Sequence, residues 1–211
     1  MSDPAAILAF GDSLTWGHAP EGGRHALADR WPSALGAGLR AAGQEVRILA
    51  EGLNGRTLIH DDWCGPADRN GARLLPTLLA THQPLAAVVI LLGTNDLVNM
   101  AVSARRCGQG MRALGRIVQR FPYEAGQVPK LVLVAPPMVE ETPGGVVTAA
   151  MADEAQALAA HYAAVAKELG AGFLDAGRVA RVSPVDGIHL DPAATRAIGA
   201  GLVPALRLAL G

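Results

Sequence analysis

The stretch Ala5-Ala6-Ile7-Leu8-Ala9-Phe10-Gly11-Asp12-Ser13-Leu14 decides the fold. Its apolar run over residues 5–10 predicts a short buried β-strand. Ser13 is therefore delivered to the carboxyl end of that strand. In open α/β sheets, ligands bind at this edge, so Ser13 is the first candidate functional residue.

Strand and helix patterns alternate along the rest of the chain. Apolar runs predict further strands over residues 46–51, 86–92, 130–135 and 172–175. Helices are expected over residues 31–42, about 69–82, from Ser103 to about 120, 153–169 and 193–210. Asp29 lies near the expected cap of the first of these helices, and Ser103 is the expected cap of the third. Residues 138–152 are expected to form a loop or lid. This alternation indicates an α/β fold, in which a five-stranded parallel sheet forms the middle of a three-layer α/β/α sandwich.

Length and composition predict one globular domain spanning residues 1–211, because half of the residues are hydrophobic and only 18% are charged. A net charge of −1 with no basic run argues against nucleic acid and anionic membrane surfaces as partners. The longest apolar stretch, residues 85–92, is far shorter than the roughly 18 residues of a membrane span. We expect a cytoplasmic protein, since the N-terminus lacks a basic signal-peptide region, and we expect Cys64 and Cys107 to be reduced and semi-buried.

Four polar segments follow the predicted strands and can meet at one sheet edge. Besides Ser13, they are Asn54-Gly55-Arg56-Thr57, Gly93-Thr94-Asn95-Asp96 and Asp186-Gly187-Ile188-His189. A serine hydroxyl needs a base to become a nucleophile, and His189 is the candidate base. Asp186 would hold the imidazole in the correct tautomer. An oxyanion could be stabilised by the backbone N–H groups of Ser13 and Gly55 and by the Asn95 side-chain amide.

Three neighbouring residues are candidates for substrate binding: Asp12, Trp16 and Thr94. Asp12, like Asp96, is expected mainly to hydrogen-bond loop backbone. Trp16 fits a pocket wall and ordinary core packing equally well. The run His60-Asp61-Asp62 lacks a tetrahedral ligand set, so no metal or other cofactor is expected. The other histidines, His18 among them, show no recognisable partner pattern.

Two other site types are excluded by their motifs. Residues 11–15 read GDSLT, which lacks the second glycine of the GxSxG nucleophile elbow of α/β-hydrolases. Dinucleotide binding requires GxGxxG after the first strand, and this chain lacks it there.

At the residues named above, the chain resembles the SGNH hydrolases, also called the GDSL esterase family. The four letters correspond to Ser13, Gly55, Asn95 and His189. The blocks GDSLTWG (11–17), EGLNGRT (51–57) and LGTND (92–96) are most similar to the bacterial arylesterase/acyltransferase branch, typified by a mycobacterial acyltransferase. The resemblance implies a flavodoxin-like fold, metal-free ester hydrolysis, and a homo-oligomer, often an octamer in that branch. Asn54-Gly55 and the segment over 138–152 depart from that branch, which affects substrate selectivity and oligomer geometry.

The resulting hypothesis is a serine esterase that cleaves short-chain aryl or alkyl esters through an acyl-enzyme. Water or an alcohol would accept the acyl group, and the resemblance also implies perhydrolysis. Two alternatives keep the same catalytic residues: a lysophospholipase or thioesterase, and a carbohydrate O-deacetylase. A non-catalytic binding module is the alternative from a different class, although every proposed catalytic position holds a competent residue.

Overall fold

A computed structural model describes residues 4–124 and 126–210 of the chain. Its centre is a five-stranded parallel sheet with the order β2-β1-β3-β4-β5. The strands span Ala5–Gly11 (β1), Val46–Gly52 (β2), Ala87–Leu91 (β3), Lys130–Ala135 (β4) and Gly172–Asp175 (β5). Each begins and ends within one residue of the predicted strand, which confirms the parallel α/β sheet.

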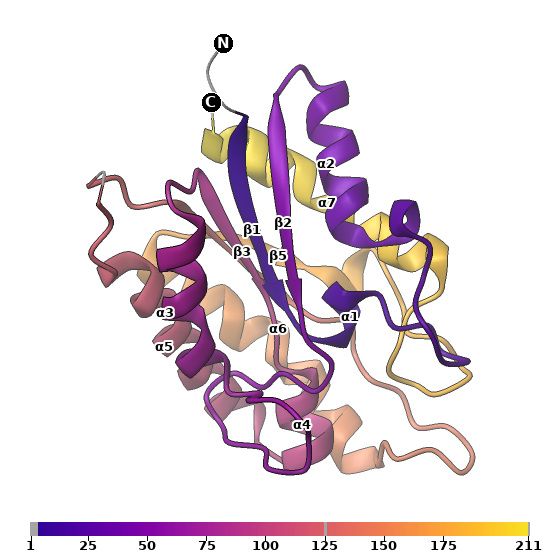
Figure 1. The fold of residues 1–211 in the computed structure, drawn as a ribbon. Helices are drawn as coiled ribbons and strands as arrows, with labels where there is room; N and C mark the ends of the chain where they lie inside the picture. The colour runs from indigo at the N-terminus through magenta and orange to yellow at the C-terminus, as the bar shows by residue number, and fades with distance from the viewer. Residues whose placement is uncertain (1–3, 125, 211) are drawn as a thin grey trace.

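Helices cover both faces of the sheet (Figure 1). The elements between and after the strands are α1 (Ser13–Trp16), α2 (Trp31–Ala41), α3 (Gly71–His82), α4 (Thr94–Met100), α5 (Ala104–Arg120), α6 (Ala149–Leu169) and α7 (Pro192–Leu210). Helices α2 and α7 pack against each other on one face, whereas α3, α5 and α6 lie on the other. The three-layer sandwich is therefore confirmed.

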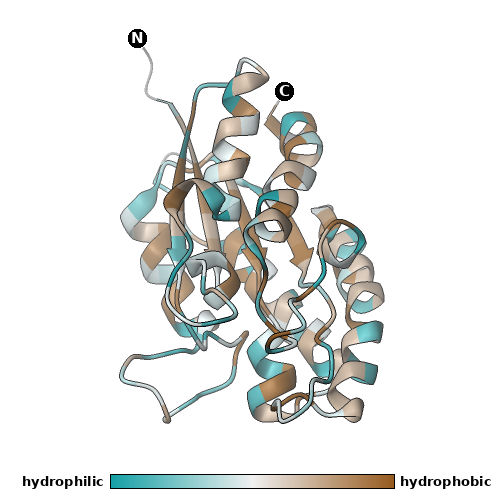
Figure 2. Ribbon diagram, turned by 90° about the vertical axis from the view of Figure 1, so that its right-hand side faces the viewer, coloured by the Kyte–Doolittle hydropathy of each residue, from teal (hydrophilic) through white to brown (hydrophobic). Residues whose placement is uncertain are grey.

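The alternating side chains of the strands build one apolar cluster on each face of the sheet. Leu8, Phe10 and Ile90 point into the cluster under α3, α5 and α6, while Ile7 and Val89 point into the cluster under α2 and α7. Figure 2 shows the hydrophobic strands enclosed by helices of mixed hydropathy. Since β1 and β3 are buried on both faces, the sheet holds their carboxyl ends rigidly, and the loops after these ends carry the polar segments.

One helix begins earlier than predicted, and one predicted cap is replaced by another side chain. Helix α6 begins at Ala149 rather than at residue 153, and the Thr148 hydroxyl accepts a hydrogen bond from the Met151 N–H. Ser103 precedes α5 but its side chain makes no capping bond; the Glu154 carboxylate accepts from the Ala104 N–H instead, at 2.6 Å.

Two short helices, α1 and α4, were not predicted at all, and both begin within the polar segments at the sheet edge. Asp29 does not cap α2 and instead forms an ion pair with Arg196. Both cysteines are free, but Cys64 is exposed rather than semi-buried, and Cys107 is fully buried.

Candidate active site

Ser13 is the first residue of α1, directly after β1. The Asp12 side chain caps this helix by accepting a hydrogen bond from the Leu14 N–H at 3.0 Å. The sharp strand-to-helix turn thereby presents the Ser13 hydroxyl at the carboxyl edge of the sheet. Ser13 is only 6% exposed, and it lines a cavity of about 260 Å³.

His189 and Asp186 meet Ser13 across the whole length of the chain. The His189 Nε2 atom lies 3.1 Å from Ser13 Oγ, and its Nδ1 atom lies 2.6 Å from Asp186 Oδ2. Asp186 Oδ1 also accepts from the backbone N–H groups of Ile188 and His189, both at 2.9 Å. Although burial raises it, these hydrogen bonds hold the pKa of Asp186 below its ordinary value, so the carboxylate stays ionised beside the imidazole.

The loop that carries Asp186 and His189 is braced by the segment before α6. The Glu140 N–H donates to the Gly187 carbonyl at 2.9 Å, and the Ser183 N–H donates to the His189 carbonyl at 2.7 Å. Gly187 has a φ of +70°, and a Cβ there would come within 1.9 Å of the Glu140 carbonyl oxygen. Only glycine fits this position without moving the loop.

The three predicted oxyanion donors face the same cavity. Ser13, Gly55 and Asn95 all line it. Among the loop and cap hydrogen bonds of the described residues, none uses the N–H of Ser13 or of Gly55, so both remain open to a ligand. The Asn95 Nδ2 group already donates to the Arg56 carbonyl at 3.0 Å and to Asp12 Oδ2 at 3.3 Å, so an oxyanion would have to compete with these acceptors.

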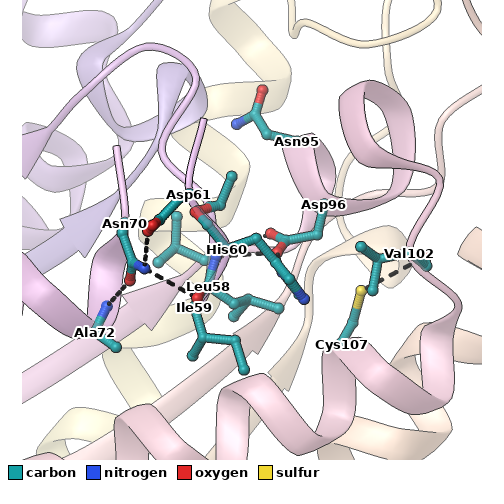
Figure 3. A network of polar contacts seen from close by, with 12 residues as sticks. Leu58, Ile59, His60, Asp61, Asn70, Ala72, Asn95, Asp96, Val102 and Cys107 are labelled. Atoms are coloured by element: carbon teal, nitrogen blue, oxygen red, sulfur yellow. Dashed lines mark hydrogen bonds and ion pairs between the residues drawn. The ribbon is translucent and has the colours of Figure 1, made fainter. Parts of the chain in front are cut away.

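The loop after β2, residues 53–60, is fixed by two buried charged groups. Asp96 accepts from the Leu58 N–H and pairs with His60 Nδ1 at 2.7 Å. Figure 3 shows the Asp96 side chain directed at His60, while the side chain of Asn95 leaves the same helix in another direction. The Arg56 guanidinium donates to the carbonyls of Gly11 and Glu51, tying the loop to the ends of β1 and β2. Burial lowers the pKa of Arg56 to about 10.

Asp12 is an ionisable residue in an unusual environment. Its side chain is fully buried, and burial raises its pKa to about 7. It does not line the cavity, and neither does Trp16, whose ring stacks under the Arg24 guanidinium at 4.4 Å. Thr94 does line the cavity, and its Oγ1 atom is buried without a hydrogen-bond partner in the described structure. Of the three substrate-binding candidates, the structure therefore brings only Thr94 to the cavity wall.

Sequence reasoning missed four residues of the cavity wall: His18, Arg69, Val98 and Asn99. The Arg69 guanidinium lies so close to Gly55 and Gly65 that a Cβ on either glycine would come within 2.6 Å of it. It also forms an ion pair with Asp62 at 2.6 Å. The one signal that could have pointed to Arg69 is its acidic, glycine-containing neighbourhood; for His18, the signal is its position five residues after Ser13.

Two further findings for the described residues concern metal-binding groups and membrane-spanning helices. No three His, Cys, Asp or Glu side chains in residues 4–124 and 126–210 gather into a metal-binding group. Nor does any helix in that part of the chain combine the length and apolar character needed to cross a membrane.

Comparison with known proteins identifies a matching family and solved structures of similar sequence and fold. The model of the GDSL-like lipase/acylhydrolase family matches residues 9–197. A carbohydrate acetylesterase family member from Sinorhizobium meliloti superposes with a TM-score of 0.92 at 43% identity, covering 98% of this chain and 99% of its own. A proposed arylesterase from Agrobacterium tumefaciens is 46% identical with a TM-score of 0.91, covering 98% and 100%. The native aryl esterase of M. smegmatis is 35% identical with a TM-score of 0.88, with the same coverage. A search of curated proteins gives no significant match.

Proposed function

This chain belongs to the GDSL-like lipase/acylhydrolase family and is a carboxylic ester hydrolase, and from that premise we propose that Ser13 is its nucleophile. The observation that carries the proposal is the continuous hydrogen-bonded line from Ser13 Oγ through His189 to Asp186. His189 Nε2 takes the hydroxyl proton as Ser13 Oγ attacks the ester carbonyl. Asp186 orients the ring and stabilises the imidazolium.

The second half of the proposed reaction uses the same groups in reverse. The tetrahedral oxyanion is stabilised by the N–H groups of Ser13 and Gly55 and by the Asn95 amide, which gives up its long contact to Asp12. As the intermediate collapses, the bond to the alcohol oxygen breaks and His189 protonates the leaving alkoxide. His189 then takes a proton from water or from an alcohol, which attacks the acyl-enzyme, and returns that proton to Ser13 Oγ as the acyl–Oγ bond breaks. Acid or ester is formed according to the acceptor, and hydrogen peroxide as the acceptor would give a peracid.

We propose short acyl chains as the preferred substrates. The cavity of about 260 Å³ lies below the range of about 300–1,000 Å³ typical of small-molecule pockets. This favours acetyl and butyryl groups over the long chains that a lysophospholipase or thioesterase would bind.

An acyl-length series tests both proposals together. Hydrolysis of p-nitrophenyl acetate, butyrate, octanoate and palmitate is compared between the native protein and Ser13→Ala. A Ser13-dependent maximum at acetate or butyrate is expected. A maximum at octanoate or beyond would reject the short-chain proposal, and full activity of Ser13→Ala would reject the nucleophile.

Carbohydrate O-deacetylation is the second candidate function, and the polar wall of the cavity favours it. Asn54, Arg69, Asn95 and Asn99 supply amide and guanidinium groups, while Val98 and Ile188 supply the apolar part. One structural neighbour is described as a carbohydrate acetylesterase family member. Release of acetate from peracetylated sugars, measured beside the p-nitrophenyl series, distinguishes the two candidates.

Three further proposals concern organisation rather than chemistry. We propose a single domain over residues 1–211, a homo-oligomer and a cytoplasmic location. Size-exclusion chromatography with light scattering tests the oligomer, limited proteolysis tests the single domain, and cell fractionation tests the location.

A further inference from the structure

His18 is a second histidine at the site, and the proposed reaction leaves it without a role. It lies two residues after the last residue of α1, and its N–H donates to the Ser13 carbonyl at 2.9 Å. Its ring lies 4.4 Å from the ring of His189, with 52° between the two planes. It lines the same cavity as Ser13 and His189.

The contact with His189 places His18 on the alcohol side of the reaction. The ester carbonyl oxygen must lie at the N–H groups of Ser13 and Gly55. The alcohol oxygen, in contrast, must lie within reach of His189 Nε2, which protonates the leaving group and deprotonates the acceptor. A side chain packed against the His189 ring therefore borders the alcohol portion of the substrate rather than its acyl portion.

The surroundings of His18 determine which ring nitrogen carries the proton. Burial and the nearby His189 lower the pKa of His18, so the ring is neutral at neutral pH. Nδ1 is buried and has no hydrogen-bond partner among the described residues. A proton on Nδ1 would be a buried unsatisfied donor, which is rarer in proteins than an unsatisfied acceptor. The proton therefore resides on Nε2, and this leaves an N–H donor to meet a ligand in the cavity.

We propose that His18 selects the alcohol portion of the ester by donating a hydrogen bond to an oxygen on the carbon next to the ester-bearing carbon. Two oxygens on neighbouring carbons can reach two rings that are in contact, one at His189 and one at His18. The substrate class is thus an ester of an alcohol with vicinal oxygens, as in a polyol or a saccharide. The inference rests on the proposed roles of Ser13 and His189.

The test uses two acetate esters that differ at a single atom. In 2-methoxyethyl acetate an ether oxygen takes the place of one CH₂ group of butyl acetate. The value of kcat/KM is measured for both esters by titrating the released acid at constant pH. The quantity compared is kcat/KM for the ether ester divided by kcat/KM for butyl acetate, which cancels errors in enzyme concentration. Comparing this ratio between the native protein and a variant cancels the different intrinsic reactivity of the two esters.

Two substitutions separate hydrogen bonding from packing. His18→Phe keeps an aromatic ring against His189 but has no donor, whereas His18→Gln keeps an N–H at a similar reach. We expect His18→Phe to lower the ratio for the ether ester by about three- to tenfold, the worth of one neutral hydrogen bond. His18→Gln should retain most of the ratio. His18→Leu, which also lacks a donor, gives the same comparison should His18→Phe be insoluble.

An unchanged ratio in His18→Phe overturns the proposal, even where both esters react more slowly, because that result assigns His18 to positioning His189 alone. Equal loss of the ratio in His18→Phe and His18→Gln overturns it as well. Ser13→Ala is measured on both esters in parallel. If that variant remains active, the proposed nucleophile fails, which is a result distinguishable from any change in the ratio.

Discussion

Asp12→Asn replaces the buried carboxyl group behind Ser13 by an amide of the same shape. We expect this change to make the protein more stable and less active. The native carboxyl is fully buried, and burial raises its pKa from 3.8 to about 7. An amide at the same place carries no charge, so it avoids the cost of burying one.

The magnitude follows from the difference between the folded and unfolded pKa values. Below about pH 3 the carboxyl is protonated in both states and costs nothing. As the pH rises towards 7, the unfolded chain loses its proton first, so the stability falls by about 1.4 kcal/mol per pH unit. The penalty is about 2 kcal/mol at pH 5 and about 4 kcal/mol at pH 8, where it is complete. Asp12→Asn removes it, which raises Tm at pH 8 by about 8–16 °C for a chain of this length.

The assay is urea unfolding of the native protein and of Asp12→Asn at pH 5 and pH 8. Asp153→Asn serves as the matched control because Asp153 is exposed on α6. The gain in the free energy of unfolding should be larger at pH 8 than at pH 5 for Asp12→Asn and absent for Asp153→Asn. A gain that is equal at both pH values, or no gain at pH 8, would refute the argument from burial.

Activity should change in the opposite direction. Asp12 Oδ2 accepts from the Asn95 amide, and an amide in its place can present a donor instead. Two facing amide donors would displace the Asn95 side chain from the cavity wall, where we propose that it meets the oxyanion. We expect kcat on p-nitrophenyl acetate to fall by about tenfold or more, a trade of activity against stability.

Three further substitutions address other parts of the site and its support. Asp186→Asn should lower kcat by about 10²–10⁴-fold without unfolding the protein, because His189 loses the carboxylate that fixes its tautomer; steady-state kinetics with circular dichroism as the folding control measures this. Gly55→Ala should lower kcat by about 10- to 100-fold, since its Cβ would lie 2.6 Å from the Arg69 guanidinium and its φ is +82°; adding Arg69→Ala should restore part of the loss, and no recovery would mean that the contact is not the cause. Tyr162→Phe should cost about 1–2 kcal/mol, because the Tyr162 hydroxyl donates to a buried backbone carbonyl just past β3 at 2.9 Å; thermal unfolding would contradict this if Tm did not fall.

The sheet could be predicted closely from the sequence because its strands are continuous apolar runs between polar segments. Helix caps were less predictable, since a distant residue can supply the cap. Glu154, which lies 50 positions from Ala104, caps α5 in place of the adjacent Ser103. Local propensity contains no information about such a partner.

In the candidate site, too, residues within motifs could be predicted, whereas residues placed by tertiary contacts could not. The residues predicted from motifs, such as Ser13, Asn95 and His189, do lie together at the sheet edge. Two of the residues that were missed, His18 and Arg69, reach the cavity only through the folding of loops with no regular period. The burial of Asp12 was also beyond sequence reasoning, because an aspartate after a strand is exposed in most turns and its environment here depends on Asn95 and Arg56.

The hydrogen bond between Ser13 and His189 joins positions 176 residues apart. During synthesis the proposed nucleophile leaves the ribosome 176 residues before its proposed base. A nascent chain that lacks His189 has no base for Ser13, and α7, which begins three residues after His189, packs against α2 in the finished fold. Under the proposed roles, ester turnover therefore reports that segments 176 residues apart have folded together, and a chain stalled before His189 cannot acylate Ser13.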